Sequence, residues 1–349
     1  MDDVLLVYAS FGEGHKQAAL SLQKFLNSPC HDLLDFCPSF VKKLYSLTYI
    51  YVSEYFPFLW HISFLLTKNK FINLVLAKVH HLLFRSFYEY LKDLAPKTVI
   101  TTHFFPPALI GSIKKELAVK VISIVTDLRV HPLWVHPCID SYCVALDETK
   151  KDLMRLGVEE QRIIAGVVPV REGFFKALSR QALRQKFGLN GKPCLLFVSS
   201  VRGRFPLLKE VLPILLKQFN VFIIYGINSR LKRYLGRLGN GSLRYFSFYT
   251  DFWELIHLSS ILISKPGGLT TFEGICKRKP FIFTHYVPGQ EKANMDVVLN
   301  YGIARFVKTK GEFLEAVGFF HAREEELQNN YPIKVDDIRP LLKELITRS

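Results

Sequence analysis

The feature that most constrains the fold is an alternation of short Val-, Ile- and Phe-rich runs with segments of helical periodicity along nearly the whole chain. Strands separated by helices favour parallel sheets built from βαβ units. Because about six strands fill one open doubly wound sheet, we predict an α/β protein with two Rossmann-like domains facing a cleft. The expected strands are 4–10, 31–36, 98–103, 119–126, 141–146 and 162–168, followed by 194–199, 221–226, 243–248, 260–264, 280–284 and 303–308.

The expected boundary between the two domains is a short Gly- and Pro-containing segment, GVVPV, that overlaps the end of the sixth run. We therefore assign residues 1–168 to a first domain and residues 169–330 to a second. Residues 331–349 are expected to form a terminal helix that packs back on the first domain.

One region, residues 40–97, interrupts the alternation with aromatic, leucine-rich and basic sequence. Its longest uncharged stretch, 55–67, is shorter than the ~20 residues that a membrane-spanning helix needs. Helices that lie in a membrane interface combine basic residues with Trp, Phe and Leu. The alternative for this insert is a helical subdomain that packs on the first sheet.

Positive charge is concentrated in the second half of the chain. Of the formal net charge of +15, residues 1–170 carry +2 and residues 171–349 carry +13. This asymmetry favours an anionic partner, such as a nucleotide diphosphate or an anionic membrane surface. Nucleic acid is disfavoured because the basic residues are dispersed without an aromatic stacking motif. The chain opens directly into a strand without an export signal, so we expect a cytoplasmic protein.

A glycine-rich turn, Gly12-Glu13-Gly14-His15, joins the first expected strand to a helix. Such a turn lets the backbone approach a ligand and directs helix-terminal N–H groups at negative charge. The GxGxxG spacing of a dinucleotide site is incomplete, which disfavours NAD. His15 is expected at the floor of the cleft between the domains.

The densest cluster of candidate residues lies in the motifs SKPGGLTTFE and PGQEKAN of the second half, both of which follow expected strands. Open α/β sheets bind ligands at the carboxyl ends of their strands. Gly267 and Gly268 would open a helix whose N-terminus receives a phosphate, and Thr270 could add a hydroxyl. Glu273, one turn further on, could accept two hydrogen bonds from a ribose diol.

These motifs, together with GEGHKQAA and the central VTDLRVHPLWVHPCIDSYCVAL, resemble the diacylglycerol glycosyltransferases, which include bacterial diacylglycerol glucosyltransferases and plant monogalactosyldiacylglycerol synthase. More distantly they are similar to the N-acetylglucosaminyl transferase that makes lipid II. The resemblance implies the two-domain GT-B fold, a UDP-sugar bound by the second domain, and inversion at the anomeric carbon.

The resemblance also assigns roles to residues. It implies that Gly268, Leu269, Thr270 and Glu273 hold the diphosphate and ribose. It also implies that the PGQEKAN motif contacts the sugar and that the backbone near Tyr249 contacts the uracil. His15 matches the general base, and Asp127 is the other candidate for that role. The expected donor-binding residues are Gly14, Arg202, Gly226, Asn228, Tyr249, Gly267, Gly268, Leu269, Thr270, Glu273, Gln290, Glu291 and Asn294.

The turn after the strand at 194–199 departs from the family pattern, because it retains one glycine, Gly203. Arg202 and Arg204 could replace backbone N–H groups with charge-assisted contacts to the diphosphate. The chain has no D-x-D motif, so we expect no metal and no other cofactor. A helix N-terminus and basic side chains can stabilise the leaving diphosphate instead.

We therefore predict an inverting transferase that moves a hexose from UDP-glucose or UDP-galactose to diacylglycerol at the inner face of an anionic membrane. The acceptor hydroxyl would lose its proton to His15 or to Asp127. Two alternatives stay open: a transferase of the lipid II type with a polyprenyl diphosphate acceptor, and a nucleotide-sugar-binding relative without turnover.

Overall fold

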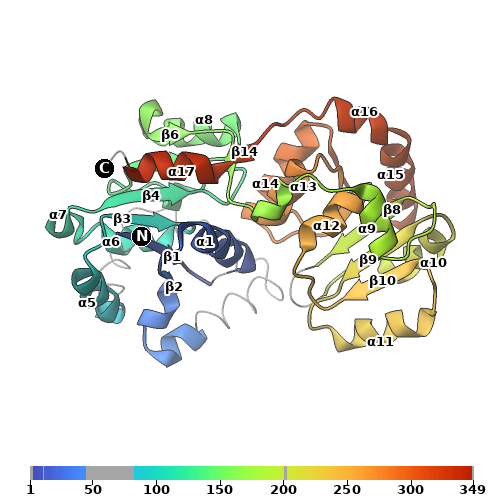
Figure 1. Cartoon of the computed structure of the whole chain (residues 1–349), viewed down its shortest axis with the longest axis horizontal. Helices are drawn as coiled ribbons and strands as arrows, with labels where there is room; N and C mark the ends of the chain where they lie inside the picture. The colour runs from blue at the N-terminus through green and yellow to red at the C-terminus, as the bar shows by residue number, and fades with distance from the viewer. Residues whose placement is uncertain (1–2, 11, 45–81, 200–202, 348–349) are drawn as a thin grey trace. The chain divides into compact units, whose positions relative to one another are not determined.

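A computed structural model describes residues 3–10, 12–44, 82–199 and 203–347. The chain divides by its internal contacts into two compact units, each an α/β domain around a parallel sheet (Figure 1). Unit 1 comprises Met1–Glu172, Val287–Asn294 and Val335–Ser349, and unit 2 comprises Gly173–Tyr286 and Met295–Lys334. The predicted α/β class with two parallel sheets is confirmed.

The sheet of unit 1 has six parallel strands in the order β2-β1-β3-β4-β5-β6. They are β1 (Val4–Tyr8), β2 (Cys30–Asp32), β3 (Thr98–Thr101), β4 (Lys120–Ile124), β5 (Ser141–Cys143) and β6 (Ile163–Ile164). The chain runs outward from β1 to β2 and then returns to place β3 on the other side of β1. The topological switch point, where such sheets bind ligands, therefore lies between β1 and β3.

Both faces of this sheet are covered, which explains why β1 is apolar throughout. Leu5 and Val7 belong to one buried cluster, and Val4 and Leu6 belong to the other, as the two-residue period of a strand requires. The helices of unit 1 are α1 (Glu13–Leu26), α5 (Arg85–Leu94), α6 (Phe105–Ile110), α7 (Lys114–Leu117), α8 (Asp147–Arg155) and α17 (Ile338–Thr347).

The carboxyl-terminal segment belongs to unit 1. Strand β14 (Asp336–Asp337) pairs in parallel with β7 (Val167–Val168), and α17 packs on the same face of the sheet as α1 (Figure 1). The single run expected at 162–168 is therefore two strands, β6 and β7, in different sheets. Gly166, between them, has a φ of +87°, which a residue with a side chain rarely adopts.

Unit 2 repeats the doubly wound arrangement with the strand order β10-β9-β8-β11-β12-β13. Its switch point lies between β8 and β11. The strands are β8 (Cys194–Val198), β9 (Asn220–Ile224), β10 (Leu243–Phe246), β11 (Ile261–Ser264), β12 (Phe281–Phe283) and β13 (Ala304–Phe306). The helices are α9 (Arg180–Lys186), α10 (Leu208–Gln218), α11 (Ser229–Leu238), α12 (Phe252–Leu258), α13 (Gly268–Cys276), α15 (Lys310–Ala322) and α16 (Glu324–Asn329), with α14 (Gln290–Asn300) beginning in unit 1 and continuing into unit 2.

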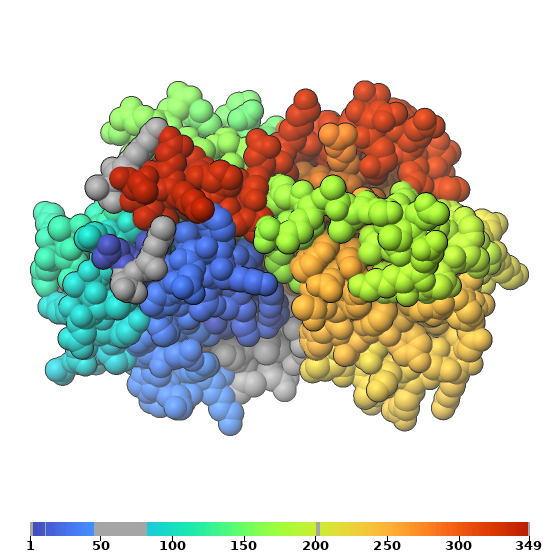
Figure 2. Space-filling view, in the orientation of Figure 1, coloured from blue at the N-terminus to red at the C-terminus, as the bar shows by residue number. Residues whose placement is uncertain are grey.

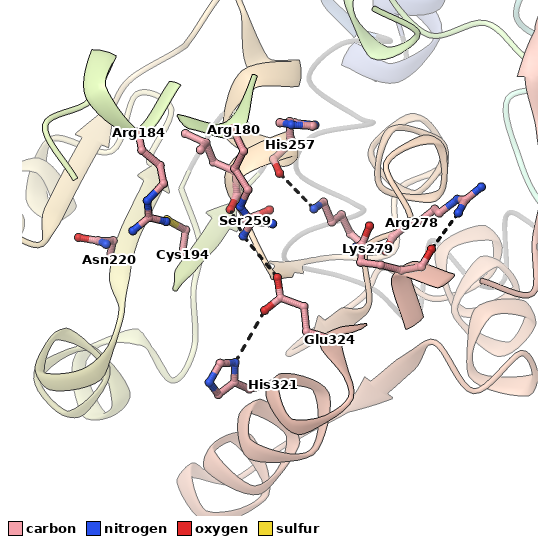
Figure 3. Close-up of polar contacts among 12 residues, drawn as sticks. Arg180, Arg184, Cys194, Asn220, His257, Ser259, Arg278, Lys279, His321 and Glu324 are labelled. Carbon is pink, nitrogen blue, oxygen red and sulfur yellow. Dashed lines mark hydrogen bonds and ion pairs between the residues drawn. The ribbon is translucent and has the colours of Figure 1, made fainter. Parts of the chain in front are cut away.

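At the amino-terminal edge of the unit 2 sheet, Lys279 is buried and donates a hydrogen bond to the carbonyl of His257 at 3.2 Å (Figure 3). Burial lowers the pKa of Lys279 to about 7, and the nearby positive charge of Arg180 adds to this effect. Arg180 itself pairs with Glu324 at 3.3 Å. This cation therefore lies away from the edge that carries the predicted donor-binding motifs.

Within the insert, residues 45–81 lie outside the described residues, so the interfacial and packing hypotheses apply mainly to chain that the structure does not describe. Its last part forms α5, whose Phe87, Tyr88 and Leu91 are buried in unit 1. Over the described ranges, no helix combines the length and the apolarity needed to cross a bilayer.

Candidate functional site

His15 lies in the first turn of α1, where three neighbouring strands of unit 1 end. Its Nδ1 is 2.9 Å from the carbonyl oxygen of Thr102, which follows β3. The same nitrogen is 2.7 Å from Oγ1 of Thr126, which follows β4. The imidazole is thus held at the switch point of the sheet, where the sequence predicts a ligand site.

These contacts determine the tautomer of His15. A carbonyl oxygen only accepts hydrogen bonds, so Nδ1 carries the proton and Nε2 holds the lone pair. The Thr126 hydroxyl fits this arrangement, because it lies 3.5 Å from the Thr102 carbonyl and can donate there while it accepts from Nδ1. Within the described part of the chain, Nε2 has no hydrogen-bond partner.

Burial also fixes the charge of His15 by lowering the pKa of the imidazole to about 4. The ring is therefore neutral at physiological pH. The edge of His103 meets it with 4.5 Å between ring centroids, and Trp134 lies at 6.3 Å. Burial lowers the pKa of His103 well below its usual value, so this neighbour is neutral as well. A neutral imidazole with an available Nε2 is the form that can accept a proton.

Asp127, the other candidate base, is almost fully buried, and both of its carboxylate oxygens accept hydrogen bonds. Oδ1 accepts from the side-chain amide of Asn294 at 3.3 Å, and Oδ2 accepts from the amide of Gln290. The carbonyl oxygen of the Asn294 side chain accepts from the backbone N–H of Leu128 at 2.9 Å. Burial raises the pKa of Asp127 to about 7; the Asn294 hydrogen bond opposes this shift and the charge of Glu291 adds to it.

The structure thus joins two groups of predicted residues that are more than 160 positions apart in the chain, Asp127 and the PGQEKAN motif. Gln290 and Asn294 belong to unit 1 because they bond the segment after β4, although the sequence analysis assigns residues 169–330 to the second domain. Glu291 in the same motif accepts a hydrogen bond from the backbone N–H of Val287 at 2.7 Å.

In unit 2, α13 begins directly after β11, at the switch point of the second sheet. The first hydrogen bond of the helix runs from Thr271 N–H to the Gly267 carbonyl at 3.0 Å. The N–H groups of Gly268, Leu269 and Thr270 therefore have no acceptor within the helix. A Cβ atom added to Gly267 would meet nothing within 4 Å, so there is open space where a phosphate could approach these donors.

Glu273 is 4% exposed, in the second turn of α13. The side chain is therefore not solvated at the surface of unit 2. A carboxylate with so little contact with water is costly unless polar groups surround it. This burial distinguishes Glu273 from the exposed acidic residues of unit 2.

Gly226 and Asn228, two predicted donor-binding residues, lie in the turn after β9 and have a structural task in this chain. The Asn228 side chain donates to the carbonyl of Gly203 at 3.0 Å and accepts from Leu231 N–H at 2.9 Å, which caps α11. Gly203 has a φ of +64°, and a Cβ there would lie 2.1 Å from the Tyr225 carbonyl. Asn228 and Gly226, with a φ of +64°, therefore shape the turn that follows β8.

Three further predicted residues of the donor site differ in what the structure shows of them. The Tyr249 hydroxyl donates to Glu254 at 2.8 Å, and Glu254 pairs with Lys186 at 2.6 Å. The Tyr249 side chain is thus engaged, and the contact between its backbone and the uracil stays a prediction. Arg202 lies outside the described residues. Gly14 precedes His15 in the first turn of α1.

Sequence reasoning missed Thr102, Thr126 and His103 as functional residues. The available signal was the run Thr101-Thr102-His103, which forms the end of the strand expected at 98–103, at the edge that binds ligands. The described ranges contain no group of three or more His, Cys, Asp or Glu side chains that could hold a metal ion.

Comparison with known proteins identifies similar sequences. The family model of monogalactosyldiacylglycerol (MGDG) synthase matches residues 15–170. A processive diacylglycerol beta-glucosyltransferase of Bacillus mycoides is 28% identical over 88% of this chain and 83% of its own length. That of Bacillus pumilus is 28% identical over 93% of this chain and 88% of its own.

Solved structures agree on the fold. The Acinetobacter baumannii MurG structure has a TM-score of 0.60 at 14% identity and covers 99% of both chains. A UDP-GlcNAc 2-epimerase from Neisseria meningitidis, bound to UDP-GlcNAc, has a TM-score of 0.58 at 14% identity over 99% of this chain and all of its own. At such identities these likenesses bear on the fold alone. They confirm the predicted fold class, GT-B with two parallel-sheet α/β domains.

Proposed function

We propose that this chain is a diacylglycerol glycosyltransferase, which its similarity to MGDG synthase over residues 15–170 and to a processive diacylglycerol beta-glucosyltransferase at 28% identity supports. In this proposal it transfers a hexose from UDP-glucose or UDP-galactose to diacylglycerol with inversion of the anomeric carbon. The observation that carries this proposal is the His15 site. A neutral imidazole with its Nδ1 proton held by Thr102 and Thr126 leaves Nε2 as a base at a ligand-binding edge.

In the proposed reaction, Nε2 of His15 takes the proton of the acceptor hydroxyl while that oxygen bonds to C1 of the sugar. The bond between C1 and the diphosphate oxygen breaks on the opposite face, and UDP leaves with the electron pair. A positioned general base contributes roughly 10²–10⁴ in rate. Burial disfavours the imidazolium that forms, and the Thr102 carbonyl, which accepts from Nδ1, offsets part of that cost.

The donor is assigned to the amino-terminal end of α13 in unit 2. The free N–H groups of Gly268, Leu269 and Thr270 would face the diphosphate, where negative charge increases as UDP departs. The positive end of the helix dipole favours the same charge. Glu273, one turn further into the helix, would accept the ribose hydroxyls.

We assign Asp127 to the orientation of sugar-binding side chains and not to proton transfer. Both of its oxygens are occupied by the amides of Gln290 and Asn294, whereas His15 keeps a nitrogen without a described partner. Ionised Asp127 accepts these amide hydrogen bonds more strongly than its protonated form does. The carboxylate would therefore hold the two amides ready for the sugar hydroxyls.

The acceptor determines where the reaction takes place. Diacylglycerol has two acyl chains and resides in a bilayer, so we propose that the enzyme works as a peripheral protein at the inner face of an anionic membrane. The concentration of positive charge in residues 171–349 supports such a surface.

The test is incubation of the protein with liposomes that contain diacylglycerol and either radiolabelled UDP-glucose or UDP-galactose. We expect a glycosyldiacylglycerol product with one of the two donors, and we expect His15→Ala to reduce turnover at least ~10²-fold while UDP affinity stays within about threefold. Turnover only with a polyprenyl diphosphate acceptor, or UDP binding without any turnover, would contradict the proposal.

A further inference from the structure

Two neighbouring segments of unit 2 carry a concentration of basic residues, with Glu210 as the acidic residue next to them. The segments 203–209 and 226–249 contain no Asp or Glu. Their cations, apart from Arg244, are Arg204, Lys209, Arg230, Lys232, Arg233 and Arg237. In the described chain none of these six forms an ion pair, whereas Lys186 and Arg305 elsewhere in unit 2 pair with Glu254 and Glu315. Arg244 is excluded because its guanidinium donates to four backbone carbonyls.

Most of this charge lies on α11. Leu235 is the one residue of the helix that is buried, while Arg230, Lys232, Arg233 and Arg237 are exposed. The helix therefore contacts its unit through a narrow apolar stripe and presents basic side chains to solvent. The yellow part of the space-filling view, which includes this segment, lies at the surface of unit 2 (Figure 2).

Two large apolar side chains are exposed beside the start of α11. Ile227 is 67% exposed and Phe248 is 61% exposed. The two residues are neighbours in space, because Gly226 N–H bonds the Ser247 carbonyl at 3.1 Å immediately before them. They therefore form an apolar pair at the carboxyl-terminal edge of β9 and β10.

A groove of about 290 Å³ lies between the amino-terminal ends of α10 and α11. Its cations are Arg204, Lys209 and Arg230, and its apolar lining includes Phe205 and Leu208. The ammonium of Lys209 lies 5.7 Å from the ring of Tyr234 on α11, so this lysine faces the groove side of the helix. Cations around an apolar floor suit a phosphate headgroup whose acyl chains continue into an apolar phase.

We propose that this face docks on an anionic lipid bilayer. We call it the α11 face and define it by Arg204, Lys209, Ile227, Arg230, Lys232, Arg233, Arg237 and Phe248. The charges attract headgroup phosphates, and the apolar pair enters the interface, which a nucleic acid or an acidic protein would not require. This proposal deepens the proposed function, since a lipid acceptor requires the enzyme at a membrane, and it gives unit 2 a membrane contact of its own.

The test uses the full chain and vesicles of phosphatidylcholine with or without phosphatidylglycerol, and it measures binding by sedimentation. Each basic residue near an anionic leaflet is worth roughly fivefold in binding. We therefore expect the triple variant Lys232→Gln, Arg233→Gln, Arg237→Gln to bind phosphatidylglycerol vesicles at least ~20-fold more weakly. Gln keeps good helix propensity, so α11 should remain folded.

A matched control removes the same charge elsewhere in unit 2, with Lys217, Lys310 and Lys334 replaced by Gln. It should bind vesicles nearly as well as the parent. An equal loss of vesicle binding in both triple variants would show an effect of net charge and overturn the proposal. Binding of the α11 triple variant as strong as that of the parent would also overturn it. Stronger competition by duplex DNA than by phosphatidylglycerol vesicles would assign the face to nucleic acid and overturn it too.

The apolar pair, Ile227 and Phe248, allows a second test that does not depend on salt concentration. The double variant Ile227→Ser, Phe248→Ser should weaken the vesicle binding that survives in high salt, because screening leaves apolar insertion unaffected. UDP binding and transfer to a short-chain, water-soluble diacylglycerol should persist in all these variants. If the proposed function is wrong, the parent protein should show no transfer to diacylglycerol. Vesicle binding by the parent and the variants would still test the α11 face in that case. Parental binding by the double variant in high salt would refute the role of the apolar pair.

Discussion

Replacing Thr126 by Val should slow sugar transfer without weakening donor binding. The Thr126 hydroxyl is buried 2.7 Å from Nδ1 of His15, and Val keeps the shape of the side chain without the oxygen. The carbonyl of Thr102 still accepts from Nδ1, so the variant loses one of two contacts. One neutral hydrogen bond contributes about 1 kcal/mol, which corresponds to a kcat reduced by about fivefold to tenfold. Loss of His15 itself should cost ~10²-fold or more.

The assay is steady-state transfer to diacylglycerol, with kcat and the donor KM measured separately. Thr126→Ser restores a hydroxyl and should recover most of the lost kcat. In a His15→Ala background, Thr126→Val should have little further effect, because residues that act through one another are not additive. An equal fall in both backgrounds, or a rise in donor KM with kcat unchanged, would refute the assignment of Thr126 as a positioning residue.

Three further outcomes follow from buried ionisable groups. Asp127 has a pKa raised to about 7, so kcat/KM should rise as pH increases through 7, and Asp127→Asn should remove this rise. His15 has a pKa of about 4 and should therefore add no inflection to the pH profile above pH 5. Glu273→Gln should weaken UDP binding by about 2 kcal/mol, roughly 30-fold by calorimetry, while Glu315→Gln on an exposed helix surface should leave it unchanged. Lys279 is neutral in the folded state above about pH 7 but stays protonated in the unfolded state up to about pH 10.5, so stability should increase between these values; Lys279→Met should flatten this slope in urea unfolding at pH 7, 8 and 9.5.

The sequence predicted most of the strands because they are short apolar runs that end in a turn, which is a local property. The run expected at 31–36 was wrong beyond Asp32, since Leu33–Phe36 form a 3-10 helix. The sequence did not separate β6 from β7, because Val167 and Val168 are as apolar as the residues before them. Their assignment to a different sheet depends on Gly166 and on pairing with Asp336 and Asp337, far away in the chain. Pairing partners of this kind are not encoded in a local pattern.

The candidate site shows the same limit at the level of side chains. His15 could be selected from its place after a strand, but the atoms that fix its tautomer come from Thr102 and Thr126, two common residues without a motif of their own. Asn228 illustrates the converse. The family resemblance assigns Asn228 to donor binding. In this structure its side-chain amide caps α11 and donates a hydrogen bond to the Gly203 carbonyl.

The two switch points explain why one architecture can supply both halves of a transfer reaction. In each unit the strand order reverses beside the first strand of the sheet, so the loops diverge there and expose the amino-terminal end of a helix. In unit 1 that helix is α1, which follows β1, and its first turn carries the neutral imidazole of His15. In unit 2 the helix is α13, which follows β11 on the other side of the switch point, and the N–H groups of its first turn have no acceptor within the helix. In the proposed reaction, helices that flank the two switch points from different sides therefore serve proton acceptance in unit 1 and charge stabilisation in unit 2.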